Sequence, residues 1–141
     1  SINMGGVFNM CKAAISELKK QEGSTIVNVG SDLGVRPIPE RIGYCPSKAG
    51  VIMLTKCIAL EYAPSIRVNA ILPGLVRTPM IEQRFTEAED PKALEESYAS
   101  LYPLHKMGKI EDMANAIAFL SSDESGFITG EIMQVCGGSL I

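Results

Sequence analysis

Several features that commonly reveal a function are missing from this chain of 141 residues. It has one histidine, His105, and its four cysteines show no Cys-x-x-Cys spacing, so a zinc site would have too few ligands close together. The net charge of -3 argues against the basic face that a nucleic-acid-binding protein needs. No apolar run has the length of a bilayer span. We therefore expect no metal site, no nucleic-acid partner and no membrane segment.

The cysteines and the N-terminal residues indicate a cellular compartment. Reduced cysteines that pack as small apolar groups in a cytosolic protein are favoured over disulfides for Cys11, Cys45, Cys57 and Cys136. Residues 1–6 have no basic region followed by an apolar block, which argues against a signal peptide. We expect a cytoplasmic protein.

Hydrophobic patterning predicts one α/β domain over residues 1–141, since 46% hydrophobic residues suffice for one core. Apolar residues at steps of three and four alternate with short β-branched runs. Helices are expected at Val7–Leu18, Tyr44–Ala63 and from Glu111 onward, and strands at Thr25–Val29, Ile66–Ile71 and Ile132–Val135. This alternation predicts a Rossmann-like, doubly wound parallel sheet with right-handed crossovers, of which only the last three strands are present.

Two segments carry more specific expectations. In the Tyr44–Ala63 helix, the residues expected to face inward are Ile52, Met53, Cys57 and Leu60. The polar stretch from about residue 80 to residue 109 is expected to be a long lid or binding segment outside the core, and it includes a helical pattern around residues 93–101.

Tyr44 and Lys48 have a spacing that suits proton transfer. Residues at i and i+4 of a helix share one face, about one turn apart. A phenol is a poor base at neutral pH because its reference pKa is ~10, and a cation held nearby lowers that value. A tyrosine beside a lysine can therefore serve as a general acid or base. The pair alone is a weak signal, because it also describes an ordinary exposed helix pair.

Many further motifs resemble those of the short-chain dehydrogenase/reductase family, in that family's order along all 141 residues. Ser31 follows the Gly23–Gly30 strand segment and lies thirteen residues before Tyr44. The other matching segments are Asn3–Phe8, Ser47–Gly50, Ala59–Ala63, Ile66–Gly74, Thr78–Met80, Ala118–Asp123, Ile128–Gly130 and Gly137-Gly138. Because so many motifs occur together at the correct spacing, the resemblance is specific.

The resemblance implies roles for individual residues. Tyr44 would exchange a proton with the substrate oxygen, and Lys48 would bind the nicotinamide ribose and hold Tyr44 partly ionised. Ser31 would donate a hydrogen bond to the substrate oxygen, although its hydroxyl could simply cap local backbone. Asn3 would order a proton-relay water, although it could also be a helix cap. The residues expected along the nicotinamide are Pro73, Gly74, Val76 and Thr78.

Three departures from the family pattern stand out. Cys136 occupies the usual position of an aspartate, and Gly30 that of a frequent serine. The third departure is larger, because no Gly-x-x-x-Gly-x-Gly loop for the cofactor pyrophosphate occurs in the chain. We therefore expect these residues to be the C-terminal half of such an enzyme, inactive by itself, and the choice between NAD and NADP is not readable.

The hypothesis is an oxidoreductase that uses NAD or NADP to interconvert a secondary alcohol and a ketone. The long segment after Pro79 favours a sugar, polyol, steroid or small ketone as substrate, and the resemblance implies a homodimer or homotetramer as the assembly. A 3-ketoacyl-carrier-protein reductase is the nearest alternative. A second alternative is a non-catalytic oligomerisation partner whose Val7–Leu18 and Tyr44–Ala63 helices pair with a full-length relative.

Overall fold

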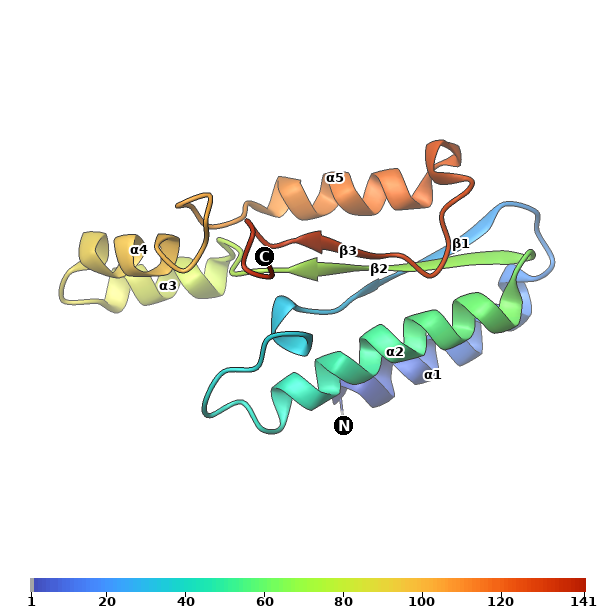
Figure 1. Ribbon diagram of the computed structural model, residues 1–141, viewed down its shortest axis with the longest axis horizontal. Coiled ribbons are helices and arrows are strands. Elements are labelled where there is room, and N and C mark those ends of the chain that lie inside the picture. The colour runs from blue at the N-terminus through green and yellow to red at the C-terminus, as the bar shows by residue number, and fades with distance from the viewer. Residues whose placement is uncertain (1) are drawn as a thin grey trace.

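The computed structural model describes residues 2–141 and places a three-stranded sheet between two sets of helices (Figure 1). Helices α1 and α2 cover one face of the sheet and α5 covers the other, while α3 and α4 lie beyond the carboxyl end of the strands (Figure 1). The elements are α1 Ile2–Leu18, β1 Ser24–Val29, the 3₁₀ turn η1 Asp32–Gly34, α2 Tyr44–Tyr62, β2 Ile66–Pro73, α3 Pro79–Glu87, α4 Pro91–Ala99, α5 Ile110–Ser121, the 3₁₀ turn η2 Asp123–Ser125 and β3 Ile132–Val135.

The three strands are parallel and lie in the order β1-β2-β3. This arrangement confirms the predicted Rossmann-like α/β fold and its three strands. The central strand β2 is almost entirely buried because helices cover both of its faces. It runs through Pro73, two residues further than predicted, and Pro73 pairs with Val135 of β3.

The main hydrophobic core lies between the sheet and the helices α1 and α2. Its fully packed members come from both helices and from β2. They are Cys11, Ile15, Ile58, Ala59, Ile66 and Val68. Burial of these side chains fixes α1 and α2 side by side against the sheet, which sets the position of the first turn of α2.

The inward face of α2 differs from the prediction. Val51, Thr55, Ile58 and Ala59 are buried, whereas three residues expected inside, Met53, Cys57 and Leu60, are exposed. Leu60 is 86% exposed. The helix carries two apolar stripes, so periodicity alone did not identify the one that packs on the sheet.

The segment expected to be a lid with one helical stretch forms a helical hairpin. Helix α4 lies close to the predicted stretch, but α3 was not predicted. Pro79 and Pro91 each stand in the first turn of one helix, where a missing N–H costs little. A small hydrophobic cluster centred on Ile81, Phe85 and Met107 packs this segment. The expectation that the segment has no core was therefore wrong, whereas its role as a lid stays a prediction.

A half-buried arginine holds the connection between α5 and β3. The guanidinium of Arg67 donates hydrogen bonds to the carbonyl oxygens of Leu120, Ser122 and Ile128 at 3.0–3.2 Å. It also reaches the Ser125 hydroxyl at 3.1 Å. These bonds satisfy the carbonyls at the end of α5 and direct the chain back into β3.

Candidate functional site

Tyr44 and Lys48 lie in the first two turns of α2. Lys48 Nζ is 5.8 Å from the centre of the Tyr44 ring, so the ammonium and the phenol are neighbours. Nζ also donates a hydrogen bond of 3.1 Å to the carbonyl oxygen of Val29, the last residue of β1. Burial lowers the pKa of Lys48. Lys48 thus connects the start of α2 to the end of β1.

Ser31 lies just beyond the end of β1 and is 7% exposed. Its Oγ accepts a hydrogen bond of 3.2 Å from the Leu33 N–H, which caps η1. The hydroxyl donates to Asp32 Oδ1, also at 3.2 Å. The local capping role considered for Ser31 is therefore present, and its hydroxyl is already bonded within its own loop.

Asp32 joins this loop to the C-terminal turn. Its carboxylate is buried, and Oδ2 accepts a hydrogen bond of 2.8 Å from the Ser139 hydroxyl. Sequence reasoning gave neither Asp32 nor Ser139 a role, because 107 residues separate them and no motif links them. The C-terminal turn therefore supports the loop that carries Ser31.

Asn3 lies against the first turn of α2. Its Nδ2 donates a hydrogen bond of 3.2 Å to Ser47 Oγ. The Ser47 hydroxyl in turn donates a hydrogen bond of 2.7 Å to the Tyr44 carbonyl oxygen. Asn3 is the second residue of α1 and not its N-cap. Its side chain thus reaches the helical turn that holds Tyr44 and Lys48.

The four residues expected along the nicotinamide follow one another at the end of β2. Pro73 is the last residue of β2, and the Gly74 N–H donates a hydrogen bond of 3.3 Å to the Val135 carbonyl. Val76 forms an isolated parallel bridge with Gly108. Thr78 occupies the N-cap position of α3, but its side chain makes no capping hydrogen bond there.

The Ser31 loop and this turn lie side by side, because β1 and β2 are neighbouring parallel strands whose carboxyl ends meet at one edge. The Gly30 N–H donates a hydrogen bond of 2.9 Å to the Ile71 carbonyl. A Cβ added to Gly30 would lie 2.6 Å from Leu72 Cδ2, so a serine at Gly30 would not fit without a shift. The small residue therefore permits the close approach of the two segments.

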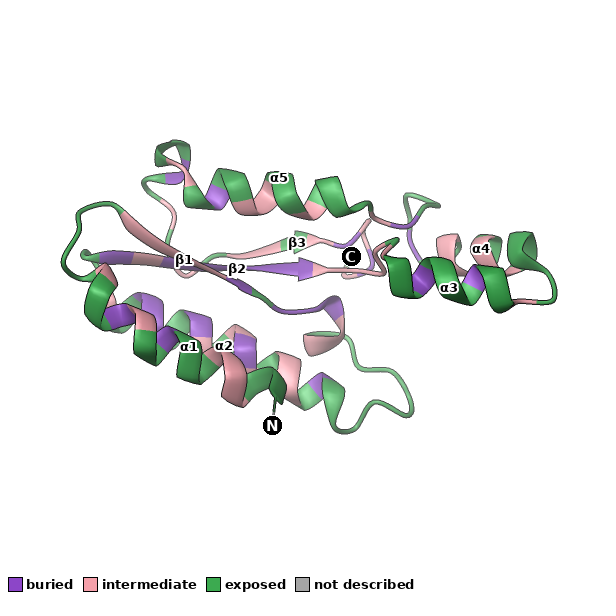
Figure 2. Ribbon diagram, turned by 180° about the vertical axis from the view of Figure 1, so that it is seen from behind, coloured by how far each residue is buried: buried purple, intermediate pink, exposed green. Residues whose placement is uncertain are grey.

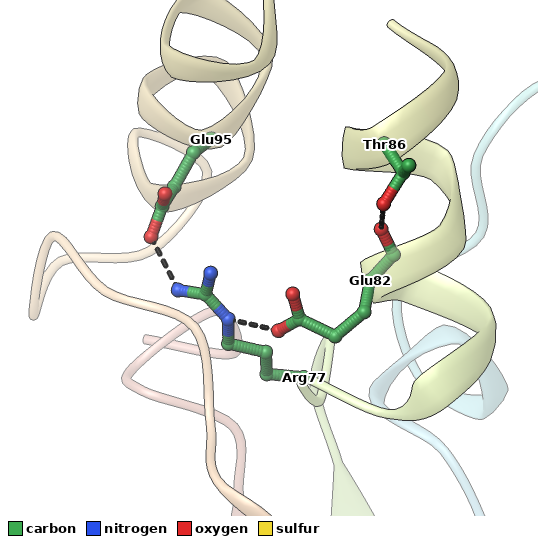
Figure 3. Close-up of polar contacts among 4 residues, drawn as sticks. All are labelled: Arg77, Glu82, Thr86 and Glu95. Atoms are coloured by element: carbon green, nitrogen blue, oxygen red, sulfur yellow. Dashed lines mark hydrogen bonds and ion pairs between the residues drawn. The ribbon is translucent and has the colours of Figure 1, made fainter.

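An arginine in the turn after β2 connects the turn to the helical hairpin (Figure 3). Arg77 Nε pairs with Glu82 of α3, and Nη1 lies 2.5 Å from Glu95 Oε1 of α4. The guanidinium also lies over the Phe85 ring at 5.4 Å. The hairpin is therefore tied to the segment expected to contact the cofactor.

Two cavities lie near the carboxyl end of the sheet. One, of about 490 Å³, is lined by the turn after β2, residues 102–115 and the C-terminal glycines. The other, of about 560 Å³, lies between residues 33–42 and the start of α2. Neither Ser31 nor Tyr44 lines either of these two cavities, and of the two only Tyr44 is exposed.

The donors gathered here suit one end of a nicotinamide cofactor. Lys48 supplies an ammonium, Tyr44 a phenol and Thr78 a hydroxyl, and groups of these kinds can bond ribose hydroxyls and a carboxamide. The chain has no glycine loop for the pyrophosphate. Among residues 2–141 there is no cluster of three potential metal ligands. Within that same range, no helix is both long and apolar enough to cross a membrane.

Comparisons with known proteins assign the chain to one family. Residues 1–139 match the family described as enoyl-(acyl carrier protein) reductase. The 3-oxoacyl-[acyl-carrier-protein] reductase of Thermotoga maritima is 41% identical over 142 residues, which cover 100% of this chain and 55% of that protein.

Two solved structures show the same arrangement of elements. A short-chain dehydrogenase/reductase of the glucose/ribitol dehydrogenase kind from Brucella melitensis matches with a TM-score of 0.86 and 34% identity, covering 99% of this chain and 54% of the other. ElxO with NADP bound matches with a TM-score of 0.91 and 34% identity, covering 98% and 55%. The chain spans about half the length of the relatives it matches, and it belongs to the short-chain dehydrogenase/reductase family of oxidoreductases.

Proposed function

We propose that the whole protein is an NAD- or NADP-dependent oxidoreductase that interconverts a secondary alcohol and a ketone. One observation carries the proposal. The Tyr44 phenol has the Lys48 ammonium beside it, and the same ammonium is bonded to the strand end that precedes Ser31. This bond links the Tyr44–Lys48 pair to the end of β1, two residues before Ser31, which supports a shared role for the three groups.

In alcohol oxidation, Tyr44 as phenolate takes the hydroxyl proton while the carbon-bound hydrogen departs with its electron pair. In ketone reduction, Tyr44 returns that proton to the oxygen. Lys48 favours the phenolate by its positive charge. Ser31 turns its hydroxyl from Asp32 to the substrate oxygen, where negative charge gathers. Asn3, bonded to Ser47, would hold a water that passes the proton onward.

The cofactor, when bound, accepts or supplies the hydride. Tyr44 and Lys48 would hold its ribose. The backbone at Pro73, Gly74 and Val76 and the hydroxyl of Thr78 would contact its nicotinamide ring, as the family resemblance implies. ElxO was solved with NADP, which supports the same class of cofactor for this protein.

The α3–α4 hairpin would close over the substrate, as elements at the carboxyl ends of such sheets do. Its two helices favour a sugar, polyol, steroid or small ketone. The relative from Brucella melitensis, of the glucose/ribitol dehydrogenase kind, supports the sugar or polyol option. The 41% identity to the Thermotoga maritima enzyme is the observation behind a second candidate, reduction of a 3-ketoacyl group on a carrier protein.

Helices α1 and α2 support a homodimer or homotetramer. Their outer faces are largely exposed (Figure 2). These faces carry the large apolar side chains of Phe8, Met53 and Leu60, which a second subunit could cover. A non-catalytic oligomerisation partner would use the same faces, but it has no need of Tyr44 and Lys48 together. The four unpaired cysteines suit a reducing, cytoplasmic location.

The test is turnover by the Tyr44→Phe variant, measured as oxidation of NADH or NADPH with a panel of sugars, steroids, small ketones and a 3-ketoacyl thioester. We expect turnover to be lost while cofactor binding stays close to that of the unmodified protein. Tyr62→Phe, at the other end of α2, is the matched control and should keep its activity. Retained turnover in Tyr44→Phe would overturn the acid–base role. We also expect little nicotinamide affinity in residues 1–141 alone, and micromolar binding there would contradict this.

A further inference from the structure

Tyr102 is a buried tyrosine between α4 and α5, with an exposed fraction of 6%. Its ring packs between two glycines of the strand ends. A Cβ added to Gly74 would lie 2.8 Å from Tyr102 Cε1, and one added to Gly137 would lie 3.3 Å from Tyr102 Cβ. Both glycines therefore leave the space that the tyrosine fills.

The Tyr102 hydroxyl accepts a hydrogen bond of 2.7 Å from the Leu75 N–H. Leu75 stands between Gly74 and Val76, in the turn that would face the nicotinamide. The Leu75 carbonyl oxygen accepts a hydrogen bond of 3.0 Å from the Gly108 N–H. Both backbone polar groups of Leu75 are thus held by the segment from Tyr102 to Gly108, so the orientation of the turn depends on that segment.

Burial raises the pKa of Tyr102, so the hydroxyl stays un-ionised over the ordinary working range of pH. Backbone hydrogen bonds next to Tyr102 in the sequence also hold this residue in place. The Tyr102 carbonyl accepts a hydrogen bond of 2.8 Å from the His105 N–H, and the Leu104 N–H donates one of 3.2 Å to the Gly137 carbonyl. An acceptor held this rigidly can restrain the amide that it binds.

We propose that Tyr102 is a positioning residue for the cofactor, fixing the Gly74–Val76 backbone through Leu75. The inference rests on the proposed function, because that backbone would contact the nicotinamide. A tyrosine serving only as core filling needs its ring and not its hydroxyl. The 2.7 Å bond from the turn is the feature that separates the two roles.

Tyr102→Phe tests the hydroxyl alone, since it keeps the ring between the two glycines. Loss of one partly buried hydrogen bond predicts a weakening of NAD(P)H binding by about tenfold. We expect a similar rise in the KM for the cofactor, with the KM for the ketone and kcat changed about twofold at most. Hydrogen exchange at the Leu75 amide, measured without cofactor, should become about tenfold faster.

Tyr98→Phe is the matched control. Tyr98 packs in the α3–α4 hairpin against Phe85, with ring centres 5.8 Å apart, and its hydroxyl has no partner among the described residues. This variant should leave cofactor binding and exchange at Leu75 unchanged.

Unchanged cofactor affinity in Tyr102→Phe would overturn the inference while leaving the proposed function intact. If the unmodified protein bound neither NADH nor NADPH, the proposed function would fail first and the inference with it. Should Tyr102→Phe not fold, hydrogen exchange in the unmodified protein still tests the inference. NAD(P)H must then slow exchange at Leu75 and Val76, and no slowing there would refute the positioning role.

Discussion

Arg77 in the turn after β2 and Glu95 in α4 form an ion pair, with Nη1 and Oε1 separated by 2.5 Å (Figure 3). Glu82 of α3 binds the same guanidinium through Nε. One arginine therefore holds both helices of the hairpin next to the turn expected to contact the cofactor. The three side chains are between 41% and 48% exposed, so salt in solution can screen them.

We predict that Glu95→Gln loosens the hairpin without unfolding the domain. A surface ion pair contributes about 0–1 kcal/mol, so global stability should change little. Hydrogen exchange in α3 and α4 should rise several-fold, and 1 M salt should produce a similar rise in the unmodified protein. Glu96→Gln is the control, because Glu96 forms no ion pair in the part of the chain that the structure describes. Equal exchange in the two variants would contradict the prediction.

Gly34 separates the Ser31 loop from α2. A Cβ there would lie 2.9 Å from the Lys48 carbonyl carbon and 3.0 Å from the Ala49 nitrogen, both backbone atoms that cannot rotate away. Gly34→Ala should lower the free energy of unfolding by about 1–3 kcal/mol, the usual range for overpacking. Because it pushes η1 from Lys48, it should also reduce turnover.

Gly43→Ala gives the comparison, since no atom lies within 4 Å of a Cβ at that position. Urea denaturation of both variants measures the effect. A Gly34→Ala protein as stable as Gly43→Ala would show that the contact between η1 and α2 is looser than described.

Lys48 should reduce stability at neutral pH. Burial lowers its pKa in the folded state, so the unfolded chain holds the proton more tightly. The sign follows from linkage. Lys48 opposes folding below the folded-state pKa, and this cost disappears as pH rises above the unfolded value of about 10.4.

Lys48→Met should therefore be at least as stable as the unmodified protein at pH 7 while losing activity. Its relative advantage should shrink toward pH 11, as measured by urea denaturation at both pH values. Lys56→Met, exposed on the same helix, should show no such trend. Lower stability of Lys48→Met at pH 7 would mean that the bond to Val29 outweighs the cost of burial.

The thiol of Cys57 can report assembly. It is the one exposed cysteine among the described residues, on the outer face of α2 with Met53 and Leu60, whereas the other three are buried. Burial also raises the pKa of Cys11 and thus slows its reaction. If α2 pairs between subunits, labelling of Cys57 by a disulfide reagent should slow as protein concentration rises. Cys57→Ser should show only slow labelling, and a rate independent of concentration would contradict pairing through α2.

The elements predicted correctly are those that residues near one another along the chain specify. Strand β3 matches its predicted bounds, and β1 differs by one residue. The prediction for α2 was wrong about its inward face because Met53, Cys57 and Leu60 repeat with the same helical spacing as the buried stripe. Helix α3 was not predicted because its polar residues outweigh Ile81 and Phe85, whose burial depends on a hairpin partner.

The candidate site divides in the same way. Tyr44 and Lys48 could be paired from sequence because one helix fixes their separation, and Ser31 could be proposed from the family resemblance. Their catalytic roles, and those of Asn3 and the Pro73–Thr78 turn, stay predictions. No spacing rule links Asp32 to Ser139, or Tyr102 to Leu75, since these pairs meet only after distant segments pack.

The sequence by itself determined the α/β class, the parallel sheet with three strands and the family, because periodicity and motif spacing depend on residues near one another along the chain. Only the tertiary structure decided which stripe of α2 faces the sheet. It alone placed Arg77 between two helices and brought the Tyr102 hydroxyl to the turn after β2. The physical reason is that such contacts depend on the packing of whole elements, whose relative positions no local pattern specifies.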